Sequence, residues 1–182
     1  KMTPNITDMI PVALAAKRGC ADSIAAINTI RAITDVDIKN FIPLPNIHGH
    51  SGITGFSGGA AKPIAFRFIA ELFNSKELKL PISGMGGIET WKDALQFMLL
   101  GSTTLQVTTA IMKYGYRIVE DMIEGLTDFM MDNNIASLSD IIGKAAIKLV
   151  EPSQFNTQYQ MIAEINEEKC IAVGDPVCSF II

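Results

Sequence analysis

Three stretches of this chain repeat the order strand, turn and helix, and this order restricts the folds that the chain can adopt. Short apolar runs predict buried strands at residues 23–27, 80–83 and 103–107. Helical spacing, with Thr7, Thr90 and Ser137 as expected caps, predicts helices at residues 7–18, 62–74, 89–100, 116–131 and 137–143. Strands that alternate with helices form parallel sheets. The order therefore predicts an α/β fold, either a doubly wound sheet or a (β/α)8 barrel.

The chemically interesting residues stand where these strands end. In both candidate folds, ligands bind at the carboxyl ends of the strands. Residues 1–5 read as the end of a further strand that begins inside a larger protein, and the other three strands end in polar or glycine-rich turns. The residues expected at this edge are Lys1, Asn28, Thr29, Met85, Gly86, Gly87, Thr108 and Thr109.

Two successive turns are suited to bind a phosphate group. Gly86 and Gly87 let the backbone approach a ligand closely because they have no Cβ. Thr108 and Thr109 open a short helical segment, whose first amides and two hydroxyls bind an anion well. A pair of such turns forms the phosphate site of many (β/α)8 barrels. The alternative, in which the turns need glycine only for their own geometry, remains open.

Asn28 and Lys1 could contact parts of a ligand other than a phosphate group. The Asn28 amide offers both a donor and an acceptor, as a cyclic imide or amide substrate requires, although an Asn that only caps a turn is an equally ordinary feature. Lys1 places a cation at a strand end, where it stabilises negative charge on a reduced ring system.

Residues 31–61 are expected to form a long connection, with five glycines, two prolines and two histidines. Loops of this length are often functional. Residues 57–61, Ser-Gly-Gly-Ala-Ala, precede a helix and offer backbone donors. They form neither a P-loop nor a dinucleotide fingerprint, because no Gly-Lys-Ser/Thr follows and no strand leads into them.

Composition excludes several classes of function. A net charge of −4 without a basic run argues against binding to nucleic acid or to an anionic membrane. Three cysteines, Cys20, Cys170 and Cys178, make no disulfide framework and no iron–sulfur module, so a reducing cytoplasm is expected. No metal site is expected, because His48 and His50 have no evident third ligand.

Six motifs follow one another along residues 1–130: Lys1-Met2-Thr3-Pro4-Asn5, Ala26-Ile27-Asn28-Thr29, Ser57-Gly58, Lys62-Pro63-Ile64-Ala65, Met85-Gly86-Gly87-Ile88 and Leu105-Gln106-Val107-Thr108-Thr109-Ala110. In this order and spacing they resemble the dihydropyrimidine and dihydroorotate dehydrogenase family. Within it, they are most similar to the flavin-carrying subunits of bacterial NAD-dependent dihydropyrimidine dehydrogenases.

The resemblance implies a flavin-binding (β/α)8 (TIM) barrel, of which this chain is the C-terminal half with a C-terminal extension. FMN is the implied cofactor, and the implied reaction moves a hydride between FMN and the 5,6 bond of uracil or thymine. By matching position, the residues implied to bind the flavin are Lys1, Gly58, Met85, Gly86, Gly87, Thr108 and Thr109. Asn28 and Thr29 are implied to bind the pyrimidine.

The chain departs from the family pattern in two ways. The family's catalytic cysteine precedes Lys1, so no residue here inherits the role of general acid, and Cys20 lies at a helix end. Residues 168–171 resemble the start of a ferredoxin-like segment, but the cysteine spacing does not continue. We therefore expect the half-barrel at residues 1–133 and a helical extension with a degraded ferredoxin-like start at 134–182.

NAD(P)H and iron–sulfur clusters are expected to act only through other segments or subunits. The expected partners are a pyrimidine substrate and a missing N-terminal half or partner subunit, because open sheet edges favour association into an oligomer. Alternative functions are dihydroorotate oxidation on the same barrel, a non-redox phosphate-binding barrel, or a non-catalytic fragment.

Overall fold

The computed structural model describes residues 1–155, and residues 1–149 form one compact unit. Residues 150–155 belong to a separate unit and contain a short 3-10 helix, η4 (Pro152–Gln154). The predicted ferredoxin-like start at residues 168–171 lies outside the described residues. The division predicted after residue 133 stays a prediction about the whole protein.

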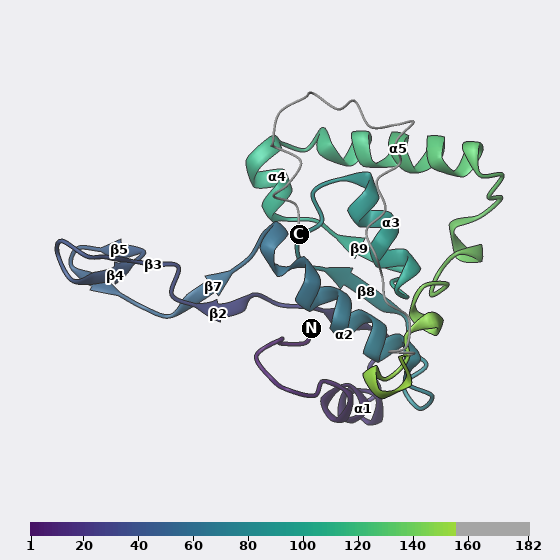
Figure 1. Cartoon of the computed structure of the whole chain (residues 1–182), viewed down its shortest axis with the longest axis horizontal. Helices are drawn as coiled ribbons and strands as arrows, with labels where there is room; N and C mark the ends of the chain where they lie inside the picture. Colours follow the sequence, from purple (N-terminus) through teal and green to yellow (C-terminus); the bar gives the residue numbers. More distant parts are fainter. Residues whose placement is uncertain (156–182) are drawn as a thin grey trace, which may run out of the picture. The chain divides into compact units, whose positions relative to one another are not determined.

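The centre of the compact unit is a parallel sheet of three strands (Figure 1). The strands are β1 (Ile24–Ala26), β8 (Ile82–Met85) and β9 (Thr104–Gln106), and β8 lies between the other two. Ile24 pairs with Ile82, and Ser83 pairs with Thr104. Each strand lies within a predicted run or overlaps it, so the α/β class and the parallel sheet are confirmed.

The chain start extends this sheet beside β1. The Met2 amide donates to the Ala25 carbonyl at 2.8 Å, and the Asn28 amide donates to the Met2 carbonyl at 2.8 Å. Residues 1–3 have no regular strand assignment, but these two bonds join them to the edge of the sheet in the position expected of a further strand end.

Five α-helices surround the sheet among the described residues: α1 (Ile10–Arg18), α2 (Lys62–Asn74), α3 (Trp91–Leu99), α4 (Thr109–Tyr114) and α5 (Ile118–Asp132). Helix α2 connects β1 to β8 through the arm described below and packs against both strands, while α3 packs against β9 and α5. The side chains buried most completely include Met9, Ile24, Phe68, Ile69, Leu72 and Phe97. The apolar faces of the helices thus form one core with the sheet.

Helix starts were predicted with mixed success. Thr90 caps α3 as expected, since its hydroxyl accepts from the Asp93 amide and the Asp93 carboxylate accepts in return from the Thr90 amide. The prediction that Thr7 caps the first helix is wrong. Helix α1 begins at Ile10, whose amide donates to the Asp8 carboxylate. The helix predicted at residues 137–143 is also wrong in type, because only the 3-10 helix η2 (Leu138–Asp140) forms there.

The connection predicted as a loop at residues 31–61 is folded. It contains three antiparallel strand pairs: β2 (Ile30–Ala32) with β7 (Thr54–Phe56), β3 (Asp35–Asp37) with β4 (Ile42–Leu44), and β5 (Asn46–Ile47) with β6 (His50–Ser51). We call residues 30–56 the arm. Figure 1 shows the arm leaving the sheet and running outward. Pro43 and Gly55 lie within β4 and β7, and Gly49 lies in the turn between β5 and β6. A 3-10 turn, η1 (Gly59–Ala61), then leads into α2.

Two 3-10 segments follow α5, η2 and η3 (Ala146–Lys148). The Gly143 and Ala145 amides donate to the carbonyls of Met98 and Leu99, so this segment is fastened to the end of α3. No helix of the described residues is long and apolar enough to cross a membrane.

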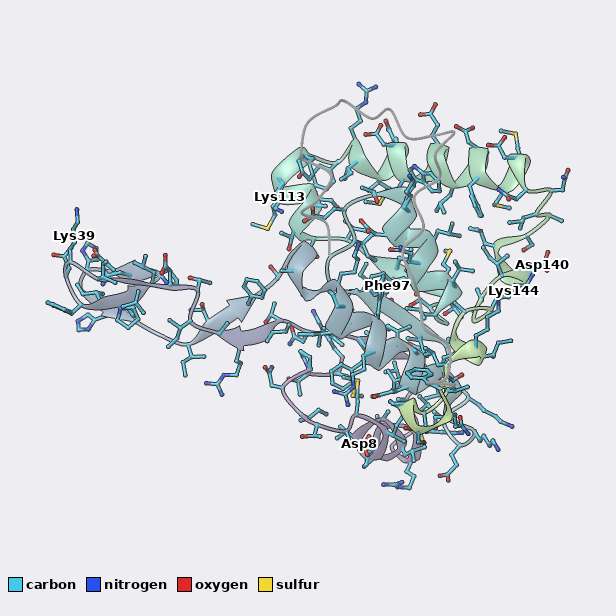
Figure 2. All side chains as sticks on the ribbon, in the orientation of Figure 1. Asp8, Lys39, Phe97, Lys113, Asp140 and Lys144 are labelled. Atoms are coloured by element: carbon cyan, nitrogen blue, oxygen red, sulfur yellow. The ribbon has the colours of Figure 1, made fainter. Side chains whose placement is uncertain are left out.

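Phe97 provides a test of the core, and Figure 2 labels its position on α3. Its ring is fully buried and meets the Phe66 ring edge-on, with centroids 4.9 Å apart. We predict that Phe97→Ala lowers the free energy of unfolding by about 3–5 kcal/mol, because a large cavity replaces the ring. Ile147→Ala, at a side chain that is 71% exposed, is the control and is expected to change it by less than about 0.5 kcal/mol. Urea denaturation measures both, and equal effects would contradict the core assignment.

Candidate functional site

All nine residues expected to bind ligand line one cavity at the carboxyl ends of the sheet strands. The cavity has a volume of about 200 Å³ and is open to solvent. Its lining includes Lys1, Asn28, Thr29, Gly58, Met85, Gly86, Gly87, Thr108 and Thr109. These residues come from five separate segments of the chain. The predicted juxtaposition is therefore present in the structure, whereas the ligand role of each residue stays a proposal.

The turn after β8 touches the turn that precedes α2. Gly86 and Gly87 have φ angles of 120° and 85°, which side chains rarely tolerate. A Cβ on Gly87 would lie 2.8 Å from the Gly58 carbonyl oxygen and 2.9 Å from the Lys62 Cβ. The two backbones therefore approach closely only because residue 87 has no side chain. This contact forms one wall of the cavity.

The turn after β9 supplies hydroxyl groups and amides. Thr108 is the N-cap of α4, but its hydroxyl makes no capping hydrogen bond. The Thr109 hydroxyl donates to the Ser57 hydroxyl at 3.0 Å, which links this turn to the one before α2. Helix α4 has only six residues. Anion binding here would therefore depend on local amides and hydroxyls more than on a helix dipole.

Asn28 and Thr29 lie between β1 and the arm, and both line the cavity. The Thr29 amide donates to the Asn28 carboxamide oxygen at 2.9 Å, so one polar atom of Asn28 is already engaged. A Cβ on Gly55 would lie 2.5 Å from the Thr29 hydroxyl oxygen. Strand β7 thus presses against Thr29 and limits where its side chain can lie.

Asn5 holds this segment in place, a role that the sequence did not reveal. Its carboxamide nitrogen donates to the Thr29 carbonyl at 3.2 Å, and its oxygen accepts from the Arg31 amide at 2.8 Å. Asn5 belongs to the first of the six motifs, but its partners lie more than twenty residues away. Only the fold brings them together.

Glu89 and Lys113 form a second link that was not predicted. The Glu89 carboxylate lines the cavity and accepts from the Gly59 amide at 3.2 Å and from the Lys113 ammonium at 2.9 Å. The hydrogen bond to Glu89 raises the pKa of Lys113, and the attraction between the two charges adds to it. Figure 2 labels Lys113 on α4. One carboxylate therefore joins α4 to the turn before α2.

Asp93 stabilises the residues around Glu89. Its carboxylate accepts from the Lys62 ammonium at 2.5 Å and from the amides of Glu89 and Thr90 at 3.0 and 2.9 Å. Burial alone would raise the pKa of Asp93, but the hydrogen bonds from Lys62, Glu89 and Thr90 together hold it below its usual value. Asp93 is thus a charged group that stabilises the start of α3 and the position of Glu89.

The remaining candidate residues lie away from the cavity. Cys20 is an exposed free thiol just after α1 and is not among the cavity residues. His48 and His50 lie in the arm, and no group of three metal-binding side chains occurs among the described residues. Cys170 and Cys178 fall outside the described range.

Comparison with known proteins assigns the class of the chain. Residues 1–130 match the profile of the dihydroorotate dehydrogenase family. The chain belongs to this family, which confirms the resemblance drawn from the six motifs.

Individual relatives extend the match. The chain is 53% identical over 175 residues to the NAD-dependent dihydropyrimidine dehydrogenase subunit PreA of Escherichia coli strain K12, covering 96% of this chain and 43% of that subunit. It is 38% identical over 145 residues to the catalytic subunit of dihydroorotate dehydrogenase B (NAD(+)) of Pyrococcus horikoshii, covering 80% of this chain and 46% of that protein. It is 39% identical over 148 residues to the chloroplastic dihydropyrimidine dehydrogenase (NADP(+)) of Arabidopsis thaliana, covering 79% of this chain and 34% of that protein. The chain thus spans less than half the length of these relatives.

The low pKa of Asp93 predicts a pH-dependent stability. Because its pKa is lowered on folding from about 3.8, the ionised carboxylate stabilises the fold above that value, and this contribution is lost as the pH falls through the folded pKa. We predict that Asp93→Asn lowers the free energy of unfolding by about 1–2 kcal/mol at pH 7. The difference from the unaltered chain should shrink below pH 4. Asp128→Asn on the exposed surface of α5 is the control, and a difference for Asp93→Asn that is independent of pH would contradict the assignment. Urea denaturation from pH 3 to 7 measures it.

Proposed function

We propose that this chain supplies the FMN-binding and pyrimidine-binding residues of a flavin-dependent oxidoreductase. The reaction would move a hydride between FMN and the 5,6 bond of uracil or thymine. The observation that carries the proposal is the convergence of nine residues, chosen from their motifs alone, on one cavity at the strand ends. The similarity to the dihydropyrimidine dehydrogenase subunit supports the choice of substrate class.

The cavity residues fit the phosphate group of FMN. Gly87 lets the glycine turn lie directly against Gly58, because a Cβ would come within 2.8 Å of the Gly58 carbonyl oxygen, and both glycines line the cavity. The Thr108 hydroxyl is not used for capping, and the turn it belongs to opens α4. Glu89 is the one carboxylate among the cavity residues, and its charge is opposed by Lys113 at 2.9 Å. An anionic group therefore meets amides and hydroxyls with little repulsion.

The other residues of the cavity fit the redox part of the site. FMN, when bound, accepts or releases the hydride. Lys1 would lie near its ring system, where a cation stabilises the negative charge of the reduced form. Asn28 and Thr29 would bind the pyrimidine, because the carboxamide nitrogen of Asn28 takes part in no hydrogen bond of the described residues and remains a donor for a ring carbonyl. The hydrogen bond from the Asn5 carboxamide to the Thr29 carbonyl would keep both residues in position.

We further propose that the chain is the C-terminal half of a (β/α)8 barrel, divided from its extension after residue 133. Three parallel strands and the joined segment at Met2 supply part of such a barrel. The general acid, the early barrel strands and the groups that handle NAD(P)H or iron–sulfur clusters would come from other segments or from a partner subunit. The name of the 53%-identical relative, a subunit, favours a partner.

Dihydroorotate oxidation is the second candidate. It is favoured by the catalytic subunits of dihydroorotate dehydrogenase B, which match 80% of the chain. Both reactions use a flavin and a cyclic imide or amide substrate, so they share the same site. Comparing flavin absorbance changes on addition of uracil, thymine and orotate to the FMN-loaded chain separates them.

An FMN titration tests the flavin proposal directly. We expect saturable quenching of flavin fluorescence by the chain, and Thr108→Glu should raise the dissociation constant at least about tenfold, because the added carboxylate repels the phosphate. Thr127→Glu on the exposed face of α5 adds the same charge away from the cavity and should leave the affinity unchanged. A folded chain that binds no FMN would refute the proposal that these residues suffice, and equal effects of both variants would remove Thr108 from the site.

A second variant tests the pyrimidine pair separately from the flavin. Gly55→Ala places a methyl group 2.5 Å from the Thr29 hydroxyl, so Thr29 must move. We predict about tenfold weaker uracil binding, a loss of about 1.4 kcal/mol, with FMN affinity retained. Gly52→Ala is the matched control in the same arm, because a Cβ at residue 52 meets nothing within 4 Å. Flavin absorbance on uracil addition gives the affinity, and unchanged binding in Gly55→Ala would exclude Thr29 as a substrate contact.

A further inference from the structure

A carboxylate lies at the end of the cavity proposed for the phosphate group of FMN. Glu89 follows the glycine turn, and its side chain lines the cavity together with Gly58 and Thr109. A Cβ on Gly58 would lie 3.8 Å from a Glu89 carboxylate oxygen and 3.9 Å from the Lys113 ammonium nitrogen. Glu89 and Lys113 are therefore both next to a residue of the proposed flavin site.

The Glu89 carboxylate is itself an anion held by two donors. Its oxygen Oε1 accepts from the Gly59 amide at 3.2 Å and from the Lys113 ammonium at 2.9 Å. A backbone amide and an ammonium group are also the kinds of donor that bind phosphate oxygens. One carboxylate oxygen thus engages two groups that a phosphate at this end of the cavity would use.

The ion pair can open without disturbing the fold around it. The side chain of Glu89 is 24% exposed and that of Lys113 is 48% exposed. Ion pairs that are exposed to solvent contribute little to stability. The main chain of Glu89 is fixed separately, because its amide donates to the Asp93 carboxylate at 3.0 Å. The Glu89 side chain can therefore change its partner while its backbone remains in place.

A second cavity offers the Glu89 carboxylate another cation. This cavity has a volume of about 430 Å³, and its lining includes both Glu89 and Arg117. The Arg117 side chain is 86% exposed, and its Nε lies 4.0 Å from the Asp121 carboxylate, a long separation for an ion pair. A carboxylate that turned from Lys113 to Arg117 would exchange one cation for another.

We propose that Glu89 competes with the phosphate group of FMN for the Gly59 amide and the Lys113 ammonium. When the phosphate binds, the carboxylate turns towards Arg117, and Lys113 donates to a phosphate oxygen instead. Glu89 then sets how tightly the site holds a phosphorylated flavin relative to one without a phosphate group. This role rests on the proposed function, since it requires the FMN phosphate at this end of the cavity.

Two substitutions that break the same ion pair test the proposal. Glu89→Gln removes the competing charge and leaves Lys113 without its anion, so we expect FMN to bind at least about fivefold more tightly. Lys113→Met removes the cation and leaves the carboxylate, so we expect FMN to bind at least about fivefold more weakly. Riboflavin, which has no phosphate group, should bind to both variants and to the unaltered chain alike. Quenching of flavin fluorescence measures each dissociation constant.

Glu124→Gln and Lys144→Met are the matched controls. They remove the same charges from exposed side chains that do not line the cavity, so both should leave the FMN affinity unchanged. Figure 2 labels Lys113 and Lys144. Inorganic phosphate provides a second measurement, because its inhibition constant against FMN should be lower for Glu89→Gln than for the unaltered chain.

The direction of the two effects separates competition from a purely structural role. An ion pair that only held α4 against the turn before α2 would make both variants bind FMN and riboflavin more weakly. That result, or an unchanged FMN affinity in Glu89→Gln, would overturn the competition and leave the proposed flavin site intact. A folded chain that binds FMN in none of these forms would overturn the proposed function, and the competition with it.

Discussion

The parallel pairing of three short strands is the constraint on which the rest of the structure depends. Parallel strands place all their carboxyl ends at one edge, so each of the following turns is directed to the same region. Here β1, β8 and β9 end in Asn28-Thr29, Gly86-Gly87 and Thr108-Thr109. Three turns that are distant in sequence therefore share one cavity.

The turns are then fastened to one another by a small set of charged and polar side chains. The Asp93 carboxylate accepts hydrogen bonds from the Lys62 ammonium and the Glu89 amide. The Glu89 carboxylate in turn accepts from the Gly59 amide and the Lys113 ammonium. This chain of contacts connects α2, α3 and α4 around the glycine turn. Asp93 is nearly buried, so its bonds are shielded from water and contribute more than the exposed pair at Lys113. The inner pair supports the fold, and the outer pair neutralises a carboxylate beside the cavity.

Much of the sheet and the cavity was predictable because the signals are local. A buried apolar run before Gly86 and a capping pair at Thr90 and Asp93 depend on neighbouring residues only, and both are confirmed. The arm was not predictable in this way, because its strands are two or three residues long and contain proline and glycine. The hydrogen bonds of Asn5 to Thr29 and Arg31 were missed for another reason. Nothing in the sequence around a carboxamide indicates partners that are more than twenty residues away.

The arm packs closely against the cavity because one residue of the arm has no side chain. Gly55 on β7 lies so close to Thr29 that a Cβ would come within 2.5 Å of its hydroxyl. Strand β7 pairs with β2, which starts immediately after Thr29, and Asn5 ties the same segment to the chain start. Thr29 therefore contacts the arm directly, and Thr109 is joined by a hydrogen bond to Ser57, the residue that follows the arm. The physical consequence is that a side chain added at position 55 would displace Thr29 at the cavity, although residue 55 itself does not line it.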